Sequence, residues 1–291
     1  NLFVASELHW ADAGLQLRQE TTYPEEGRTR LVFTCKRPLP LTVRIRHPAW
    51  ASAGFAVHVN GQQQPVASEP GSFADIARTW QTGDTIEVVL PFTVRVEGFP
   101  DAPNRVAFLH GPLVLCAPID DDVPRAPGCP ALVAEAGQLP SVLTPVPDRP
   151  SVFTAAPQAV RIFSAPHDDA PHDDAVTFEP LYRVHGNRAY VVYWDTFTPE
   201  EWQVRKEHAA FLAAVTVDRV LPGDEESERA HNMQGENTAT GEGKWRHATD
   251  GGWFAWDLQG AADTPLELHV TYWGSDSGGR EFDVLVNDQQ V

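Results

Sequence analysis

Apolar and polar side chains alternate with a period of two through much of residues 1–120. Leu41, Val43 and Ile45 are separated by polar residues, and the same spacing recurs at residues 15–17, 55–59 and 86–90. This period places apolar side chains on one face of a β-strand and polar ones on the other. Asn60-Gly61 after one of these runs is a strong hairpin signal. The pattern predicts short antiparallel strands that pack as a β-sandwich.

Residues 105–116 have a different pattern, because two apolar runs meet at Gly111-Pro112 and neither has a polar face of its own. A strand without a polar face must be covered on both sides. We therefore expect this segment at the centre of a sandwich.

Residues 121 to about 175 are dominated by Pro and Asp, which suits edge strands and long loops, and residues 189–194 form a strong strand signal. One helix is predicted at about 199–214. Thr198 is its N-cap, Pro199 takes the first helical position, and Glu201 completes a capping box. Residues 221–226 are interpreted as a loop or linker.

Short strands are predicted again at residues 252–258, 266–273 and 281–286, where the chain ends while still in a sheet. In the second of these, Leu266, Leu268, Val270 and Tyr272 are expected to face inward. The fold class is therefore all-β and mainly antiparallel, with two to three β-sandwich or jelly-roll-like domains and one short helix. The expected domains are residues 1–120, 121–220 and 221–291, the last jelly-roll-like and truncated.

Charge and length narrow the classes of function. The 40 acidic and 22 basic residues give a net charge of -18, which argues against binding to nucleic acid or to an anionic membrane surface. No apolar run approaches the roughly 18 residues that cross a bilayer. The chain begins at Asn1 within a strand-like run, so we expect it to be a segment of a longer protein.

Three cysteines, Cys35, Cys116 and Cys129, are an odd number without C-x-x-C spacing. This arrangement predicts neither a disulfide framework nor a zinc site, and Cys35 and Cys116 lie in apolar strands as core thiols. A duplicated His-Asp-Asp motif at residues 167–169 and 172–174 is interpreted as a solvated loop rather than a metal site. No metal-binding residue is assigned.

Aromatic residues near the end of the chain are the best candidate for a binding site. Trp245, Trp253, Trp273, Asp276 and Arg280 would form a patch in which indole rings stack on the C–H faces of a sugar and polar groups bind its hydroxyls. The alternative is that the same Trp residues pack between domains. The sequence leaves both interpretations open.

Several segments together resemble a known family. They lie in order at residues 1–10, 17–24, 43–50, 57–61 and 105–116. They are similar to the C-terminal β-region of glycoside hydrolase family 127, the β-L-arabinofuranosidase-like proteins. Residues 120–215 and 225–291 resemble accessory domains of longer members of that family.

The resemblance implies a parent enzyme that removes L-arabinofuranosyl residues from plant-type glycans. In that family a preceding helical barrel carries the catalytic groups, with a zinc-bound Cys as nucleophile and a Glu as acid/base. None of those positions maps onto this chain, so no catalytic residue is assigned, and any zinc is expected in the barrel.

The expected role is therefore a non-catalytic region that braces the barrel, its main partner. The alternative is a carbohydrate-binding module that contacts plant-type glycan through exposed Trp residues. The exact sugar and the compartment stay open, although the resemblance favours a periplasmic or secreted parent.

Overall fold

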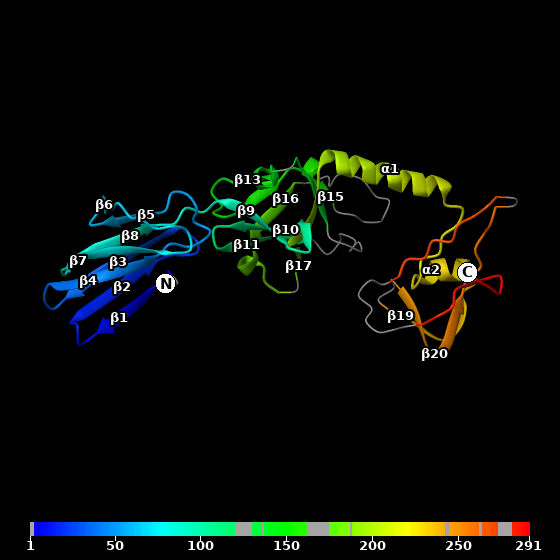
Figure 1. Cartoon of the computed structure of the whole chain (residues 1–291), viewed down its shortest axis with the longest axis horizontal. Coiled ribbons are helices and arrows are strands. Elements are labelled where there is room, and N and C mark those ends of the chain that lie inside the picture. The colour runs from blue at the N-terminus through cyan, green and yellow to red at the C-terminus, as the bar shows by residue number, and fades with distance from the viewer. Residues whose placement is uncertain are drawn as a thin grey trace. The chain divides into compact units, whose positions relative to one another are not determined.

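A computed structural model describes residues 3–119, 130–135, 137–161, 175–186, 188–241, 245–261, 264–272 and 281–291. The chain divides into two compact units, Asn1–Ala209 and Ala210–Val291, and each is described by itself. Figure 1 shows a structure dominated by strands. All strand pairs of the described residues are antiparallel except one, and the predicted all-β, mainly antiparallel fold class is confirmed.

The first unit begins with a two-layer sandwich. One layer is a six-stranded sheet in the order β1 (Ser6–Trp10), β2 (Leu15–Thr21), β3 (Arg28–Cys35), β8 (Thr85–Val89), β5 (Ala56–Val59) and β6 (Gln62–Gln63). The other layer is the pair β4 (Leu39–Arg46) and β7 (Phe73–Trp80). The predicted alternation is confirmed here, because the apolar positions of both layers are turned toward one core.

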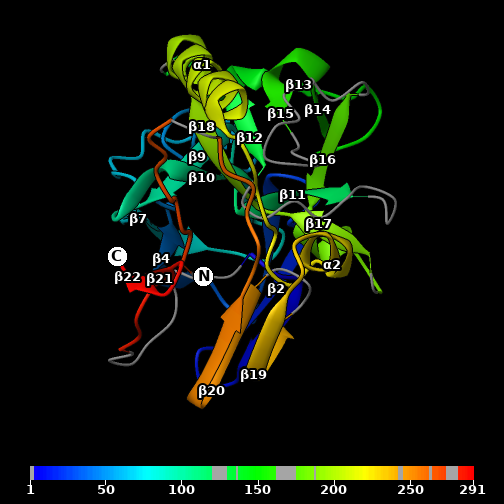
Figure 2. The same cartoon turned by 90° about the vertical axis from the view of Figure 1, so that its right-hand side faces the viewer.

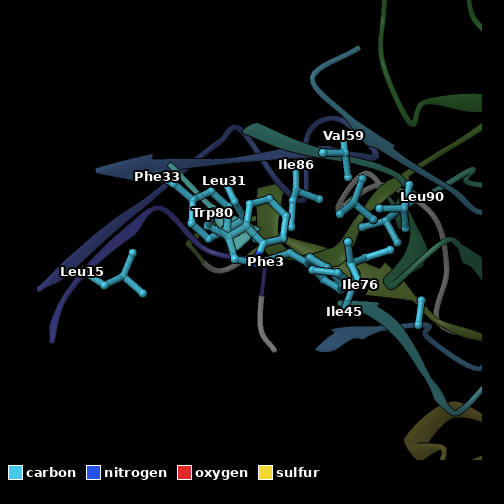
Figure 3. Packing of buried hydrophobic residues seen from close by; sticks show 13 residues of the cluster. Phe3, Leu15, Leu31, Phe33, Ile45, Val59, Ile76, Trp80, Ile86 and Leu90 are labelled. Atoms are coloured by element: carbon cyan, nitrogen blue, oxygen red, sulfur yellow. The ribbon is translucent and has the colours of Figure 1, made fainter. Parts of the chain in front are cut away.

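The centre of this core is an aromatic stack between the layers. The rings of Phe33 and Trp80 lie 4.1 Å apart and nearly parallel, and neither residue is exposed. Figure 3 shows this pair beside Phe3 and Leu31. The indole Nε1 of Trp80 donates to the carbonyl of Leu41 at 2.9 Å, so the ring is buried without leaving its polar atom unpaired.

The predicted turn at Asn60-Gly61 joins β5 to β6. Both residues have positive φ, 51° and 79°, as a type I′ hairpin turn requires. The side-chain amide of Asn60 also donates from Nδ2 to the Asp84 carboxylate at 2.8 Å, which connects this turn to the one before β8.

The second half of the same unit is a ten-stranded sheet. Its path is β13 (Leu143–Pro145), β14 (Phe153–Ala155), β16 (Val176–Pro180), β11 (Leu113–Ile119), β10 (Ala102–His110), β18 (Tyr193–Phe197), β12 (Ala131–Val133) and β15 (Val160–Arg161). Off this path, β9 (Val94–Phe99) pairs with β10 and β17 (Ala189–Val191) pairs with β11. The parallel pair is β12 with β18. Three short 3-10 helices, Leu139–Val142, Pro157–Ala159 and Leu181–Arg183, connect strands.

The segment 105–116 lies in the middle of this sheet. The predicted cover on both faces is present in its second run, where Leu113, Leu115 and Cys116 are buried, whereas Arg105 and Ala107 of the first run are only partly buried. It supplies most of β10 and the start of β11, which form a hairpin around Gly111-Pro112. Val106, Phe108 and Leu115 belong to the second core, where Phe108 meets Phe178 edge-on at 5.6 Å.

The predicted helix is α1 (Pro199–Val215). Its capping box is present in both directions: the Glu201 amide donates to the Thr198 hydroxyl at 3.2 Å, and the Thr198 amide donates to the Glu201 carboxylate at 2.8 Å. Trp202 is the buried side chain of this helix and packs against Phe197. No helix among the described residues is long and apolar enough to span a membrane.

The second unit contains α2 (Glu225–Ala230) and the hairpin of β19 (Gln234–Gly241) and β20 (Trp245–Ala255), with α2 beside it in Figure 2. A small ribbon of β21 (Leu285–Val286) and β22 (Gln289–Gln290) follows. The interpretation of residues 221–226 as a loop or linker is wrong at its end, because α2 begins at Glu225. Asp224 caps this helix by accepting from the Ser227 amide at 2.8 Å, a local signal that the loop interpretation missed.

The prediction of strands at 266–273 and 281–286 is also wrong over most of the described residues. Residues 266–272 contain no regular strand, and only Leu285–Val286 of the last segment is paired. Leu266, Leu268, Val270 and Tyr272 are exposed rather than turned inward. Alternation alone does not make a strand, because each strand also needs a neighbour that accepts its backbone hydrogen bonds. Trp273 lies outside the described residues.

Candidate functional site

The predicted aromatic patch in the second unit is only partly visible. Trp245 and Trp253 both lie on β20, and Trp253 is 46% exposed. Trp245 is half-buried, and its ring lies 5.1 Å from that of His247. Asp276 and Arg280 lie outside the described residues, as does Trp273. The structure therefore places two of the five predicted residues on one strand and says nothing about the other three.

A buried ion pair holds this strand against α2. Arg246 of β20 donates from Nε to the Glu228 carboxylate at 2.7 Å, and the Gly223 amide donates to the same oxygen at 3.0 Å. Both charged side chains are about nine-tenths buried. The hydrogen bond from Arg246 lowers the pKa of Glu228, so this carboxylate stays ionised and paired. It is suited to fixing β20, and it is a poor proton donor.

A second polar contact fixes the chain on either side of this hairpin. Asp218 accepts from the Gln259 amide at 2.6 Å and lies 3.1 Å from His231 Nε2. Hydrogen bonds to the Ser227 carbonyl and to Asp218 raise the pKa of His231. The sequence predicted neither the pair of Glu228 and Arg246 nor the contacts of Asp218, because these contacts join residues 13 to 41 positions apart.

The described cysteines are unsuited to nucleophilic chemistry. Cys116 is fully buried, and burial raises the pKa of its thiol to about 11. Burial also raises the pKa of Cys35, which is partly buried against the first core. Both thiols are free and stay protonated at neutral pH, so neither is a ready nucleophile or metal ligand. Cys129 and the two His-Asp-Asp motifs lie outside the described residues.

Potential metal-ligating side chains are also not clustered in the part of the chain that the structure describes. Within the described ranges, no three His, Cys, Asp or Glu side chains are placed together so that they could hold a metal ion. The zinc that the family resemblance implies therefore has no matching ligand set in this part of the chain.

One Ser–His contact invites comparison with a hydrolase. The hydroxyl of Ser151 lies 3.1 Å from His110 Nδ1, and Ser151 has a positive φ of 59°. However, the His110 ring is enclosed edge-on by Phe92 and Phe153, and Ser151 is itself buried. A buried hydroxyl cannot reach a substrate carbonyl or sugar, so this pair is a packing contact.

Around Phe92, the first sandwich joins the ten-stranded sheet. The Phe92 ring meets Tyr23, Trp50 and His110 edge-on at 5.4–6.1 Å. A Cβ on Gly111 would lie 2.5 Å from this ring, so the β10–β11 turn approaches as closely as only glycine allows.

A polar cluster continues the junction. Glu25 of the first sandwich accepts from the Tyr182 hydroxyl and from the Arg183 guanidinium of the second sheet. Arg183 also donates to the Pro150 carbonyl at 2.9 Å. The hydrogen bond from Tyr182 and the charge of Arg183 lower the pKa of Glu25, which keeps its carboxylate ionised. These contacts hold the first sandwich against the region of the ten-stranded sheet within the first unit.

The outermost strand of the first sandwich leaves apolar side chains uncovered. β1 is an edge strand in Figure 1 and all five of its residues are exposed. Leu8 and Trp10 are 50% and 46% exposed, although they pair with Leu17 and Leu15 of the core-facing row. Directly paired residues share a face of the sheet, so Leu8 and Trp10 lie on the same face as the core residues Leu15 and Leu17. This part of the face is not covered by the second layer of the sandwich. We call Leu8 and Trp10, with the exposed Val4 just before the strand, the β1 stripe.

Comparison with known families supplies the context for this geometry. Residues 1–92 match the family described as "Beta-L-arabinofuranosidase, GH127 middle domain". This chain carries a GH127-related region. That region is the first sandwich, and the residues described by the structure include no helical barrel. Residues 211–291 match a family of unknown function, DUF6805.

Parts of three solved structures are similar to this chain, and the one with a TM-score above 0.5 shares its fold. Ara127N-Se, a GH127 beta-L-arabinofuranosidase from Geobacillus stearothermophilus T6, is 24% identical with a TM-score of 0.52, covering 67% of this chain and 33% of its own. A second GH127 beta-arabinofuranosidase is 22% identical, with a TM-score of 0.48 and coverage of 67% and 34%. A structure described as a glycoside hydrolase is 23% identical, with a TM-score of 0.47 and coverage of 65% and 34%.

The chain thus spans about a third of the length of these solved structures. The search of curated proteins gave no match.

Proposed function

We propose that this chain is the non-catalytic β-region of a glycoside hydrolase that acts on L-arabinofuranosyl-type plant glycans, and that its first sandwich braces a helical catalytic barrel. The match over residues 1–92 and the length of the solved relatives support this role. The buried thiols and the paired carboxylates described above agree with a part of the enzyme that does no bond-breaking itself.

The β1 stripe is the observation that carries the proposal. β1 has apolar residues at positions 8 and 10, and Val4 lies just before the strand, while Glu7 and His9 on its opposite face form an exposed pair at 3.4 Å. This is the pattern of a strand with one face in a core, yet that face is uncovered in the described structure. An exposed apolar edge strand is a liability for a soluble protein unless another surface covers it. A neighbouring domain of the same polypeptide is the cover that we propose.

The first test is catalytic. The purified chain should not hydrolyse 4-nitrophenyl β-L-arabinofuranoside, with or without added zinc, while the full-length product of its gene should. Turnover by the purified 291-residue chain would overturn the non-catalytic assignment.

The second test addresses the brace. In the full-length protein, the double variant Leu8→Ser, Trp10→Ser should make the barrel more sensitive to limited proteolysis and shorten the half-life of its activity at elevated temperature. The matched control is Glu7→Ser, His9→Ser on the opposite face of β1, which should leave both unchanged. Equal behaviour of the two double variants would contradict docking through the β1 stripe.

Binding of carbohydrate by the second unit is the second candidate function. The exposed indole of Trp253 on β20 favours it, because a ring held on a strand presents a flat face to a sugar. Affinity electrophoresis on arabinan and arabinogalactan should show retardation that Trp253→Ala removes. Unchanged mobility of the wild-type chain would leave the brace as the function of this region.

A further inference from the structure

We infer that the outer face of the ten-stranded sheet carries a binding site for a neutral oligosaccharide, centred on Phe99 and Tyr193. These two rings come from β9 and β18 and contact each other, with centroids 5.1 Å apart. They are 38% and 46% exposed, so both rings are open to a ligand. We call this surface, with Glu97, Arg105 and Asp195, the outer-face platform.

Strand register places these residues on one face. Tyr193 is opposite Ala107 on β10, and Ala107 is opposite Glu97 on β9. Asp195 lies two residues after Tyr193, so its side chain is on the same side. The residues between them, Val106 and Trp194, point the other way into the second core. The platform is thus the reverse side of a well-packed sheet, which gives it a rigid base.

The polar groups of the platform are already arranged. Arg105 Nε and one terminal nitrogen donate to the two oxygens of Asp195 at 2.8 and 3.1 Å, a bidentate pair. Arg105 remains 42% exposed in this pair, and Glu97 beside it is 62% exposed. Fixed donors and acceptors next to aromatic rings are what hydroxyl-bearing ring compounds need for orientation.

The charges of the platform and of the whole chain indicate whether a neutral or an anionic glycan would bind. Asp195 is neutralised by Arg105, and Glu97 is paired with Arg95 at 3.0 Å, so the platform carries no net excess of positive charge. The whole chain has a net charge of -18, which further repels an anionic glycan. The apolar part consists of two rings, too small for the apolar centre of a stable protein interface but matched to one or two sugar rings. A neutral oligosaccharide fits these features best.

The competing explanation is that Phe99 and Tyr193 only stabilise the sheet as an aromatic pair across strands. Such a pair would affect stability but not ligand binding. The two explanations therefore differ in one measurable property, the affinity for glycan of a variant that is still folded.

The test uses native affinity electrophoresis of the 291-residue chain in gels with neutral arabinan, arabinogalactan or xylan, with anionic polygalacturonate, or with no polysaccharide. At least one neutral polysaccharide should retard the wild-type chain, and polygalacturonate should not. Tyr193→Ala and Phe99→Ala should each weaken this retardation about tenfold, because each removes a stacking ring. Circular dichroism and thermal unfolding check that both variants are folded, and Tyr193→Phe, which keeps the ring, should retain most of the binding.

Two control variants separate this site from others. Tyr190→Ala removes an equally exposed tyrosine on β17 of the same unit, and Trp253→Ala removes the candidate ring of the second unit. Tyr190→Ala should bind like the wild type. Trp253→Ala measures how much of the retardation comes from the second unit, and Tyr193→Ala should weaken the retardation in the Trp253→Ala background as well. The inference is overturned if no neutral polysaccharide retards the wild-type chain, if polygalacturonate retards it equally, or if Tyr193→Ala has no larger effect than Tyr190→Ala. None of these results bears on the brace, because the β1 stripe is tested separately.

Discussion

The two units of the chain use similar sequence patterns with different results. In the first sandwich, alternating apolar residues of six strands meet a second layer and become a closed core. In the second unit, the same alternation at residues 266–272 gives exposed side chains and no regular strand. The described part of that unit is held instead by polar contacts, above all the buried pair of Glu228 and Arg246. The comparison teaches that alternation predicts which face is apolar, while a partner surface decides whether that face becomes a core.

The largest expected change in stability compares a residue of the first core with an exposed residue of the second unit. Phe33→Ala should lower the free energy of unfolding of the first unit by about 3–5 kcal/mol, because it removes a fully buried ring stacked on Trp80. Phe282→Ala in the second unit should cost less than about 0.5 kcal/mol, since that ring is 62% exposed. Hydrogen exchange of peptides from each unit, read by mass spectrometry in urea, measures both. Similar costs would mean that the second unit has an apolar core around Phe282 after all.

The next effect tests the polar support of the second unit. Arg246→Met should destabilise the α2–β20 region by about 3 kcal/mol, because Glu228 would stay buried without a cation. Arg44→Met is the control, since the pair of Arg44 and Asp75 is largely exposed and should contribute less than about 1 kcal/mol.

The same pair gives a pH dependence whose sign follows from the lowered pKa of Glu228. The pair should stabilise the wild type above about pH 4.3, the ordinary Glu value, and this stability should be lost as the pH falls through the lower folded-state pKa. The Arg246→Met variant should lack this part of the acid transition. A variant with the wild-type pH profile would show that another group holds Glu228 ionised.

The smallest effect concerns the junction inside the first unit. Burial between aromatic rings lowers the pKa of His110, so the unfolded chain binds a proton more readily than the folded one. Stability should therefore be fully present above about pH 6.5 and fall as the pH drops below it, by less than about 1 kcal/mol. His110→Gln should flatten the dependence of the melting temperature on pH between 7.5 and 5.5. An unchanged slope would assign that dependence to other groups.

Several features of the candidate sites were within reach of the sequence, and others were not. Trp253 lies in the predicted strand at 252–258, and the structure places it on β20 with 46% exposure. The outer-face platform could not be found in this way, because Arg105 and Asp195 are 90 residues apart and meet only through the pairing of β10 with β18. The helix α2 was missed because its short capped turn lies in a run rich in charge, where the loop signal of Pro222-Gly223 dominated.

The sequence by itself determined the local features, because their causes lie within a few residues. The capping box of Thr198 and Glu201 starts α1, the Asn60-Gly61 pair makes a turn that needs positive φ, and alternation assigns each strand an apolar face. Tertiary structure alone decided which apolar faces are covered. The β4–β7 layer closes over Phe33 and leaves Leu8 and Trp10 open, since hydrophobic burial depends on a partner surface that can come from any distance along the chain.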